Sequence, residues 1–152
     1  MTGPSWWRGR SWRFWLSVLS PLLLMGGCGL FALHSRKMAA DAERAADVFH
    51  RRLAGAQYDT IYDAAAPSFR AGVTRVDSAR YFSAINVKMG ACKPPDAPSY
   101  FTNTSTSGTH VQLRYRMQCA NGLLRETMLY LITSGGPLLA GYDASSPALV
   151  IR

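Results

Sequence analysis

The sequence predicts an α+β fold in which an N-terminal membrane helix precedes three helices packed on one face of a four-stranded antiparallel meander. Three observations predict it. An uncharged apolar run lies near the N-terminus, apolar residues recur at helical spacing up to residue 89, and the period changes to alternation after Pro94 and Pro95. The 152 residues suffice for one domain plus an anchoring segment. We therefore expect a membrane anchor or signal segment at 1–37 and an extracytoplasmic α+β domain at 38–152.

The first element is an uncharged run of twenty residues, Phe14–Leu33. As a helix this run would be about 30 Å long, which matches the hydrocarbon core of a bilayer. Arginines precede it at positions 8, 10 and 13. Four tryptophans, whose rings favour the membrane interface, stand among them: Trp6, Trp7, Trp12 and Trp15. The pattern predicts contact with a membrane through residues 14–33.

Cys28 leaves open how this segment is attached. Met25-Gly26-Gly27-Cys28 resembles a bacterial lipobox, whose cysteine is lipidated, although Met25 stands where Leu, Val or Ile is usual. The chain stays apolar after Cys28, as a spanning helix requires, whereas Pro21 and the nearby glycines weaken such a helix. An uncleaved anchor, with Cys28 as a small apolar residue, is slightly favoured over a lipoprotein. Both alternatives place residues 38–152 outside the cytoplasmic membrane, in the periplasm, and tethered to it.

The positive charge of the chain is concentrated beside the apolar run. Residues 1–37 contain five cations and no acid, so they account for five of the eight net charges. Cations in this position hold a segment at a lipid surface. The domain itself is mildly basic and has no block of Lys or Arg interleaved with aromatic residues. The charge pattern therefore argues against nucleic-acid binding.

Helical spacing predicts three helices in the domain. Residues 38–55 have one apolar stripe, composed of Ala42, Ala45, Phe49 and Leu53. Residues 58–69 predict a second, short helix that a proline breaks. A capping box, Thr74-Arg75-Val76-Asp77, opens a third helix that ends near residue 89. Its buried side is expected to consist of Tyr81, Phe82, Ile85 and Met89.

Alternation predicts four strands after the prolines. Residues 109–119 alternate most clearly, with an apolar row of Val111, Leu113, Tyr115, Met117 and Cys119. The opposite row is polar and contains His110, Gln112, Arg114, Arg116 and Gln118. Asn121-Gly122 is a strong hairpin signal and leads into a strand at 123–133. A weaker strand, "SYFTNTST", comes before this pair, and "LLAGYDA" comes after it.

The chain resembles small bacterial envelope proteins that have a nuclear-transport-factor-two-like or cystatin-like roll. The resemblance covers roughly residues 40–147 and rests on "AGAQYDTIYDAAAPSFRAGVTRVDSARYF", its Gly-x-x-Tyr-Asp-x-x-Tyr-Asp rhythm, and the terminal "LLAGYDAS". It implies a roll behind a lipoprotein signal or single anchor. Most such proteins have no assigned function, and the roll serves enzymes, ligand binders and scaffolds alike.

Cys92 and Cys119 are expected to form a disulfide. A hairpin centred near Ser107 places Cys119 opposite residue 95 or so, one short proline-containing stretch from Cys92. The bridge would close a loop of about 27 residues and stabilise the domain by about 3 kcal/mol. An extracytoplasmic location permits it. The alternative is two separate buried thiols.

No residue is assigned a catalytic, cofactor-binding or metal-ligating role from the sequence. Enzymes on the roll generally place an Asp/His pair between helices and sheet, but no sequence cue joins Asp59, Asp63 or Glu126 to a histidine. The two aspartates are expected to cap the helix or to pair with Arg52 or Arg70, and Glu126 with Arg114 or Arg116. The histidines at 34, 50 and 110 are expected to be solvated. Without a Cys-x-x-Cys motif, a zinc site has no support.

The expected function is that of a non-enzymatic, membrane-tethered envelope protein serving as an interaction or scaffold module. Its partner would be an unknown protein or small ligand. Arg114 and Arg116, in the polar row of the strand at 109–119, are candidate partner-binding residues that would bind an anionic partner. Two other functions stay open, a lipid- or small-molecule-binding pocket and an undescribed enzyme on the same roll. A deep apolar cavity would favour the pocket, and a carboxylate or histidine inside that cavity would favour the enzyme.

Overall fold

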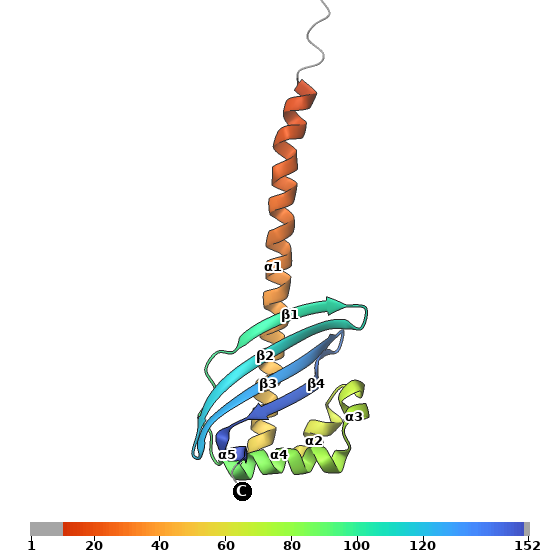
Figure 1. Cartoon of the computed structure of the whole chain (residues 1–152). Coiled ribbons are helices and arrows are strands. Elements are labelled where there is room, and N and C mark those ends of the chain that lie inside the picture. Colours follow the sequence, from red (N-terminus) through yellow and green to blue (C-terminus); the bar gives the residue numbers. More distant parts are fainter. Residues whose placement is uncertain (1–10, 151–152) are drawn as a thin grey trace, which may run out of the picture. The chain divides into compact units, whose positions relative to one another are not determined.

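The computed structural model describes the backbone of residues 11–150 and the side chains of residues 33–150 (Figure 1). The chain divides into two units, Met1–Arg36 and Lys37–Arg152. The described residues of the first unit, from 11 onward, are helical. The second unit is α+β, as predicted, and contains the four described strands.

The predicted membrane segment, apart from Leu33, lies outside the residues whose side chains are described. It covers positions 14–33, including the candidate lipid acceptor Cys28, whereas the description of side chains begins at residue 33. Among the described residues, no helix is both long enough and apolar enough to cross a bilayer.

Helix α1 spans Ser11–Ala54, and its part from Lys37 onward belongs to the second unit. The apolar stripe predicted for 38–55 is confirmed in its main features. The buried residues recur every three or four positions along the helix: Ala39, Ala42, Ala46, Phe49 and Leu53. This stripe is the surface that α1 packs into the core.

The predicted helix over 58–69 is in fact two helices, α2 at Tyr58–Asp63 and α3 at Pro67–Gly72. Pro67 begins α3 instead of only ending α2. A proline fits the first turn of a helix because its missing N–H has no intrahelical partner there and its fixed φ is already helical.

Helix α4 spans Arg75–Met89 and starts as predicted. The Thr74 hydroxyl accepts a hydrogen bond from the backbone N–H of Asp77 at 3.1 Å. Of the side chains predicted to be buried on this helix, Tyr81 is the exception, at 40% exposed. Its hydroxyl lies at the domain surface and accepts a hydrogen bond from the backbone N–H of Ala144.

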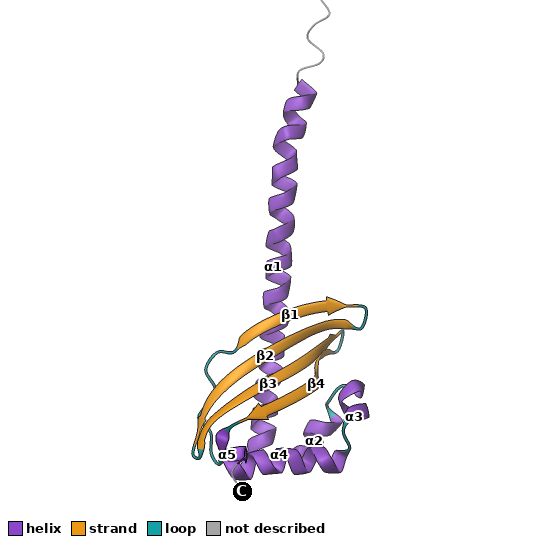
Figure 2. Ribbon diagram, in the orientation of Figure 1, coloured by secondary structure: helices purple, strands orange, loops and turns teal. Residues whose placement is uncertain are grey.

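Four strands form one antiparallel sheet in chain order, which confirms the predicted meander (Figure 2). Their bounds are β1 Ser99–Ser105, β2 Gly108–Cys119, β3 Gly122–Thr133 and β4 Gly136–Ser145. A short helix that the sequence did not predict, α5 at Pro147–Val150, follows the last strand.

One face of the sheet is buried beneath the helices. The apolar row predicted for β2 is confirmed, since Val111, Leu113, Tyr115, Met117 and Cys119 are all buried. This row packs with the α1 stripe, Ile61 of α2 and Phe82 of α4 in the main core cluster, and with Ile85 and Met89 in a second cluster towards the end of α4. The opposite face of the sheet contains the polar row of β2.

The β2–β3 turn lies one residue earlier than the Asn-Gly signal indicated. Cys119 pairs with Gly122, so Ala120 and Asn121 form the turn. This turn packs on the C-terminal end of α4. The side-chain amide of Asn121 donates to the backbone carbonyl of Lys88 at 2.8 Å, and the backbone N–H of Asn121 donates to the backbone carbonyl of Met89. These bonds satisfy carbonyls that the helix end leaves without an intrahelical partner.

Candidate functional site

A carboxylate lies in the buried face of the sheet. Glu126 is 1% exposed and belongs to the inward row of β3, with Leu124, Met128 and Tyr130. It stands opposite Tyr115 of β2. The predicted pairing of Glu126 with Arg114 or Arg116 is therefore wrong, because those two residues face the other side of the sheet.

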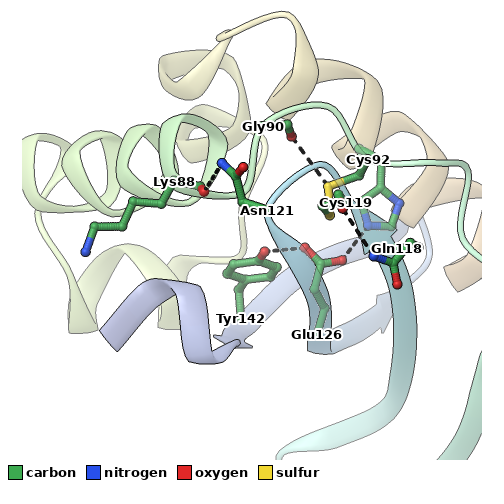
Figure 3. Close-up of a disulfide and its surroundings, with 9 residues drawn as sticks. Lys88, Gly90, Cys92, Gln118, Cys119, Asn121, Glu126 and Tyr142 are labelled. Carbon is green, nitrogen blue, oxygen red and sulfur yellow. Dashed lines mark hydrogen bonds and ion pairs between the residues drawn. A yellow bond between two sulfur atoms is a disulfide. The ribbon is translucent and has the colours of Figure 1, made fainter. Parts of the chain in front are cut away.

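Glu126 instead pairs with a histidine from α1. His50 Nε2 lies 2.7 Å from Glu126 Oε2, and the hydroxyl of Tyr142, on β4, donates to Glu126 Oε1. Figure 3 shows Tyr142 and Glu126 facing each other across the two strands. The His50 side chain is 15% exposed, so the expectation that it is solvated is also wrong. No motif in the sequence links His50 to Glu126, yet the fold brings the two side chains together.

The surroundings keep Tyr142 protonated. Burial raises the pKa of the Tyr142 hydroxyl well above its usual value, and the nearby charge of Glu126 raises it further. Tyr142 is therefore a hydrogen-bond donor to the carboxylate at any ordinary pH. Burial likewise raises the pKa of Tyr115, whose ring packs edge-on against His50 with centroids 5.2 Å apart.

The network leaves one nitrogen of His50 available. An ionised carboxylate only accepts hydrogen bonds, so the contact with Glu126 assigns a proton to Nε2. In the neutral ring, Nδ1 is then an acceptor. Nδ1 is buried and has no hydrogen-bond partner among the described residues. An unsatisfied polar atom inside a domain is uncommon and is a position where a ligand group or a water could bind.

His50 lines a cleft of about 650 Å³ between the helices and the end of the sheet. The inner wall is apolar and comes from four elements, with Leu53, Ile85, Met89, Met117 and Leu124. The outer wall is the segment after α4, from Gly90 to Pro95, and the rim contains Asp47, Arg51 and Lys93. This size is within the range of clefts that enclose a small organic ligand.

The predicted disulfide is present and forms part of this wall. Cys92 and Cys119 are bonded, with their α-carbons 3.8 Å apart (Figure 3). Cys92 is exposed and lines the cleft, whereas Cys119 is buried beneath α4. The bridge holds the segment from Gly90 to Pro95 against the end of the β2–β3 hairpin.

The other candidate carboxylates lie away from the cleft. Asp59 and Asp63 both pair with Arg75, not with Arg52 or through an ion pair with Arg70 as expected. Arg70 donates only to the backbone carbonyl of Asp63. The hydrogen bond from Arg75 lowers the pKa of the Asp63 carboxyl. Among the described residues, no three His, Cys, Asp or Glu side chains gather as a metal site requires.

A search with protein-family models finds no match to this chain, and a search of curated proteins finds no related sequence.

Proposed function

We propose that the chain is a non-enzymatic binding protein of the bacterial cell envelope. In this proposal residues 14–33 tether it to the cytoplasmic membrane, and the domain 38–152 is a nuclear-transport-factor-two-like or cystatin-like roll on the periplasmic side. The cleft between α1, α4 and the sheet binds a small apolar or amphipathic molecule. The observation that supports this best is the size and apolar lining of the cleft.

The lining indicates the chemistry of the ligand. An apolar body fits the side chains of Ile85, Met89 and Met117, since each removes apolar surface from water. A polar head group fits the rim, where Arg51 and Lys93 supply positive charge, and a hydroxyl could donate to His50 Nδ1. A lipid-like molecule with a short chain and a polar end meets these conditions.

Filling the cleft tests this proposal. Ala91 is exposed and lines the cleft, so tryptophan can occupy the space there without entering the core; Ala97, exposed on the same segment outside the cleft, is the matched control. Full-length protein is titrated with an environment-sensitive naphthalene fluorophore and then with fatty acids of increasing length. We expect displaceable binding that Ala91→Trp abolishes and Ala97→Trp preserves. Equal binding by both variants would place the ligand elsewhere.

The tether is tested separately. With an uncleaved anchor, the protein keeps its full mass, resists carbonate extraction, and is unaffected by Cys28→Ala. Palmitate labelling that disappears in Cys28→Ala would instead establish a lipoprotein.

A second function, proton-transfer catalysis in the same cleft, is favoured by the pairing of His50 with Glu126. A carboxylate that holds one nitrogen of an imidazole orients the ring and leaves the other nitrogen to take a proton from a substrate. His50→Gln distinguishes the two functions once a ligand is known. A binding protein keeps an unchanged ligand, whereas an enzyme converts the ligand and loses that conversion in the variant.

A further inference from the structure

The outer face of the sheet, on the side away from the helices, contains a cluster of three exposed arginines. Arg114 and Arg116 extend from β2, and Arg125 extends from β3. Arg116 and Arg125 are direct partners in the antiparallel register. Arg114 is two residues from Arg116, so its side chain points to the same face. The sequence indicated the first two residues, and the register adds the third.

No ion pair neutralises this charge among the described residues. Among the described residues, no carboxylate lies within ion-pair distance of any of the three, and Arg114 donates only a long hydrogen bond, 3.4 Å, to Gln112. Glu126, the nearest acid along β3, is turned inward to His50. Like charges directly opposite each other destabilise a sheet. The Arg116–Arg125 pair thus opposes folding unless a partner supplies the opposite charge.

The surrounding surface is suited to contact with a protein. Phe101 of β1 is 64% exposed and Leu123 of β3 is 39% exposed. Both lie on this face, since Phe101 pairs with Gln112 and Leu123 with Gln118. Arginine and large apolar side chains, mixed on an open surface, are the composition that marks protein interfaces.

We propose that Arg114, Arg116 and Arg125, with Phe101 and Leu123, form a docking surface for an acidic segment of a protein partner. Opposite residues on neighbouring strands lie about 5 Å apart, and alternate residues on one strand about 7 Å apart. Carboxylates at alternate positions of an extended segment have this same spacing. The planar guanidinium groups bind such carboxylates through paired hydrogen bonds.

Asp143 distinguishes an acidic segment from an anionic membrane surface. It is exposed on β4 and faces the same side, opposite Thr127. A flat anionic bilayer laid on the sheet would contact Asp143 as well as the arginines and would be repelled by it. A narrow segment lying over β1 to β3 avoids that residue. This surface is independent of the cleft, so the proposal does not depend on the ligand proposed above.

The test uses full-length protein in detergent and a labelled peptide of alternating glutamate and valine, followed by fluorescence anisotropy. The Arg116→Gln/Arg125→Gln variant removes the like-charge pair, so its fold is retained. Arg44→Gln/Arg80→Gln removes the same charge from exposed residues elsewhere and is the matched control. We expect wild-type binding that weakens with salt, falls about tenfold or more in the first variant, and changes little in the control.

Charge reversal completes the test. Arg116→Glu/Arg125→Glu should lose the acidic peptide and gain the corresponding lysine–valine peptide. Equal losses in both glutamine variants would show attraction to net charge alone and overturn the proposal. So would the absence of peptide binding together with arginine-dependent binding to phosphatidylglycerol vesicles, which would assign the surface to lipid.

Discussion

His50 Nε2 and Glu126 Oε2 lie 2.7 Å apart although 76 residues separate them in the chain. The contact joins α1 to β3 across the core, and the Glu126 side chain is fully removed from solvent. A buried carboxylate is tolerated only where hydrogen-bond donors replace water. His50 and Tyr142 are those donors. Because His50 belongs to α1, this helix must keep its position over the sheet for the buried Glu126 carboxylate to retain its hydrogen bond.

Removing His50 should destabilise the domain strongly. His50→Ala leaves Glu126 buried with a single side-chain donor, and we expect a loss of about 2 to 4 kcal/mol in the free energy of unfolding. Denaturant titration measures it, with His34→Ala, at an exposed histidine, as the control. The double variant His50→Leu/Glu126→Leu should lose less than the sum of the single changes, because no charge is then left unpaired. Additive losses would show that the two residues do not interact.

Reduction of the disulfide should lower the melting temperature of the protein. In a Cys28→Ala background, denatured protein should show no titratable thiol, because Cys92 and Cys119 are bonded. Opening the loop returns conformational freedom to the unfolded chain, which lowers the free energy of unfolding by about 3 kcal/mol. Calorimetry with and without reductant measures the shift. Two free thiols in acid-quenched protein from the envelope would contradict the bond.

Stability should fall in alkaline solution. Burial raises the pKa values of Tyr115, Tyr130 and Tyr142 in the folded protein, whereas unfolded tyrosines titrate near pH 10. Above that pH the unfolded state releases protons that the folded state retains. The stabilisation from these groups is therefore complete below pH 10 and lost as the pH rises.

The Tyr142→Phe variant measures the contribution of Tyr142 to this loss of stability at high pH. The variant should be less stable at neutral pH, where Glu126 loses a donor, yet its stability should decline less steeply above pH 10. Denaturation at several pH values, with ultraviolet absorbance of tyrosinate, measures both effects. An unchanged slope would show that Tyr142 titrates alike in the folded and unfolded protein.

Phe82 should be the most sensitive apolar position on α4. It is fully buried and packs against Phe49 and Tyr142, with ring centroids 5.6 and 5.5 Å away. Phe82→Ala should destabilise the domain by about 3 to 5 kcal/mol, since the cavity adds to the lost burial. Val87→Ala, at a side chain 75% exposed on the same helix, should change stability by less than about 0.5 kcal/mol. Similar losses at both positions would contradict this packing.

The period of apolar residues predicted most elements of the domain, but not the short helices α3 and α5. The alternation of Val111, Leu113 and Tyr115 predicted a strand with one buried face, and the structure confirms it. The capping box at Thr74 predicted the start of α4, because that interaction is local. The break at Pro67 was also predicted, but not that the proline begins a further helix, α3, as its fixed φ permits.

The candidate site was harder to predict because its residues are polar and come from three distant elements. Glu126 lies in the same alternating row of β3 as Leu124 and Met128, and the hairpin register turns this row inward. The alternation of residues could therefore have identified Glu126 as buried. His50 lies four residues after buried Ala46 and three before Leu53, at the edge of the α1 stripe. Neither pattern reveals that the two side chains meet. That depends on how α1 lies over the sheet, which tertiary packing decides.

The chain-order meander also has a consequence for folding kinetics. Each strand pairs only with its neighbour in sequence, so the three hairpins can form without closing long loops. Docking of α1 on β3 joins residues far apart in the chain, and its entropic cost is higher. We expect hairpins to form before the transition state and α1 to dock after it. Shortening a side chain in the α1 stripe, such as Leu53→Ala, should then accelerate unfolding while the folding rate hardly changes.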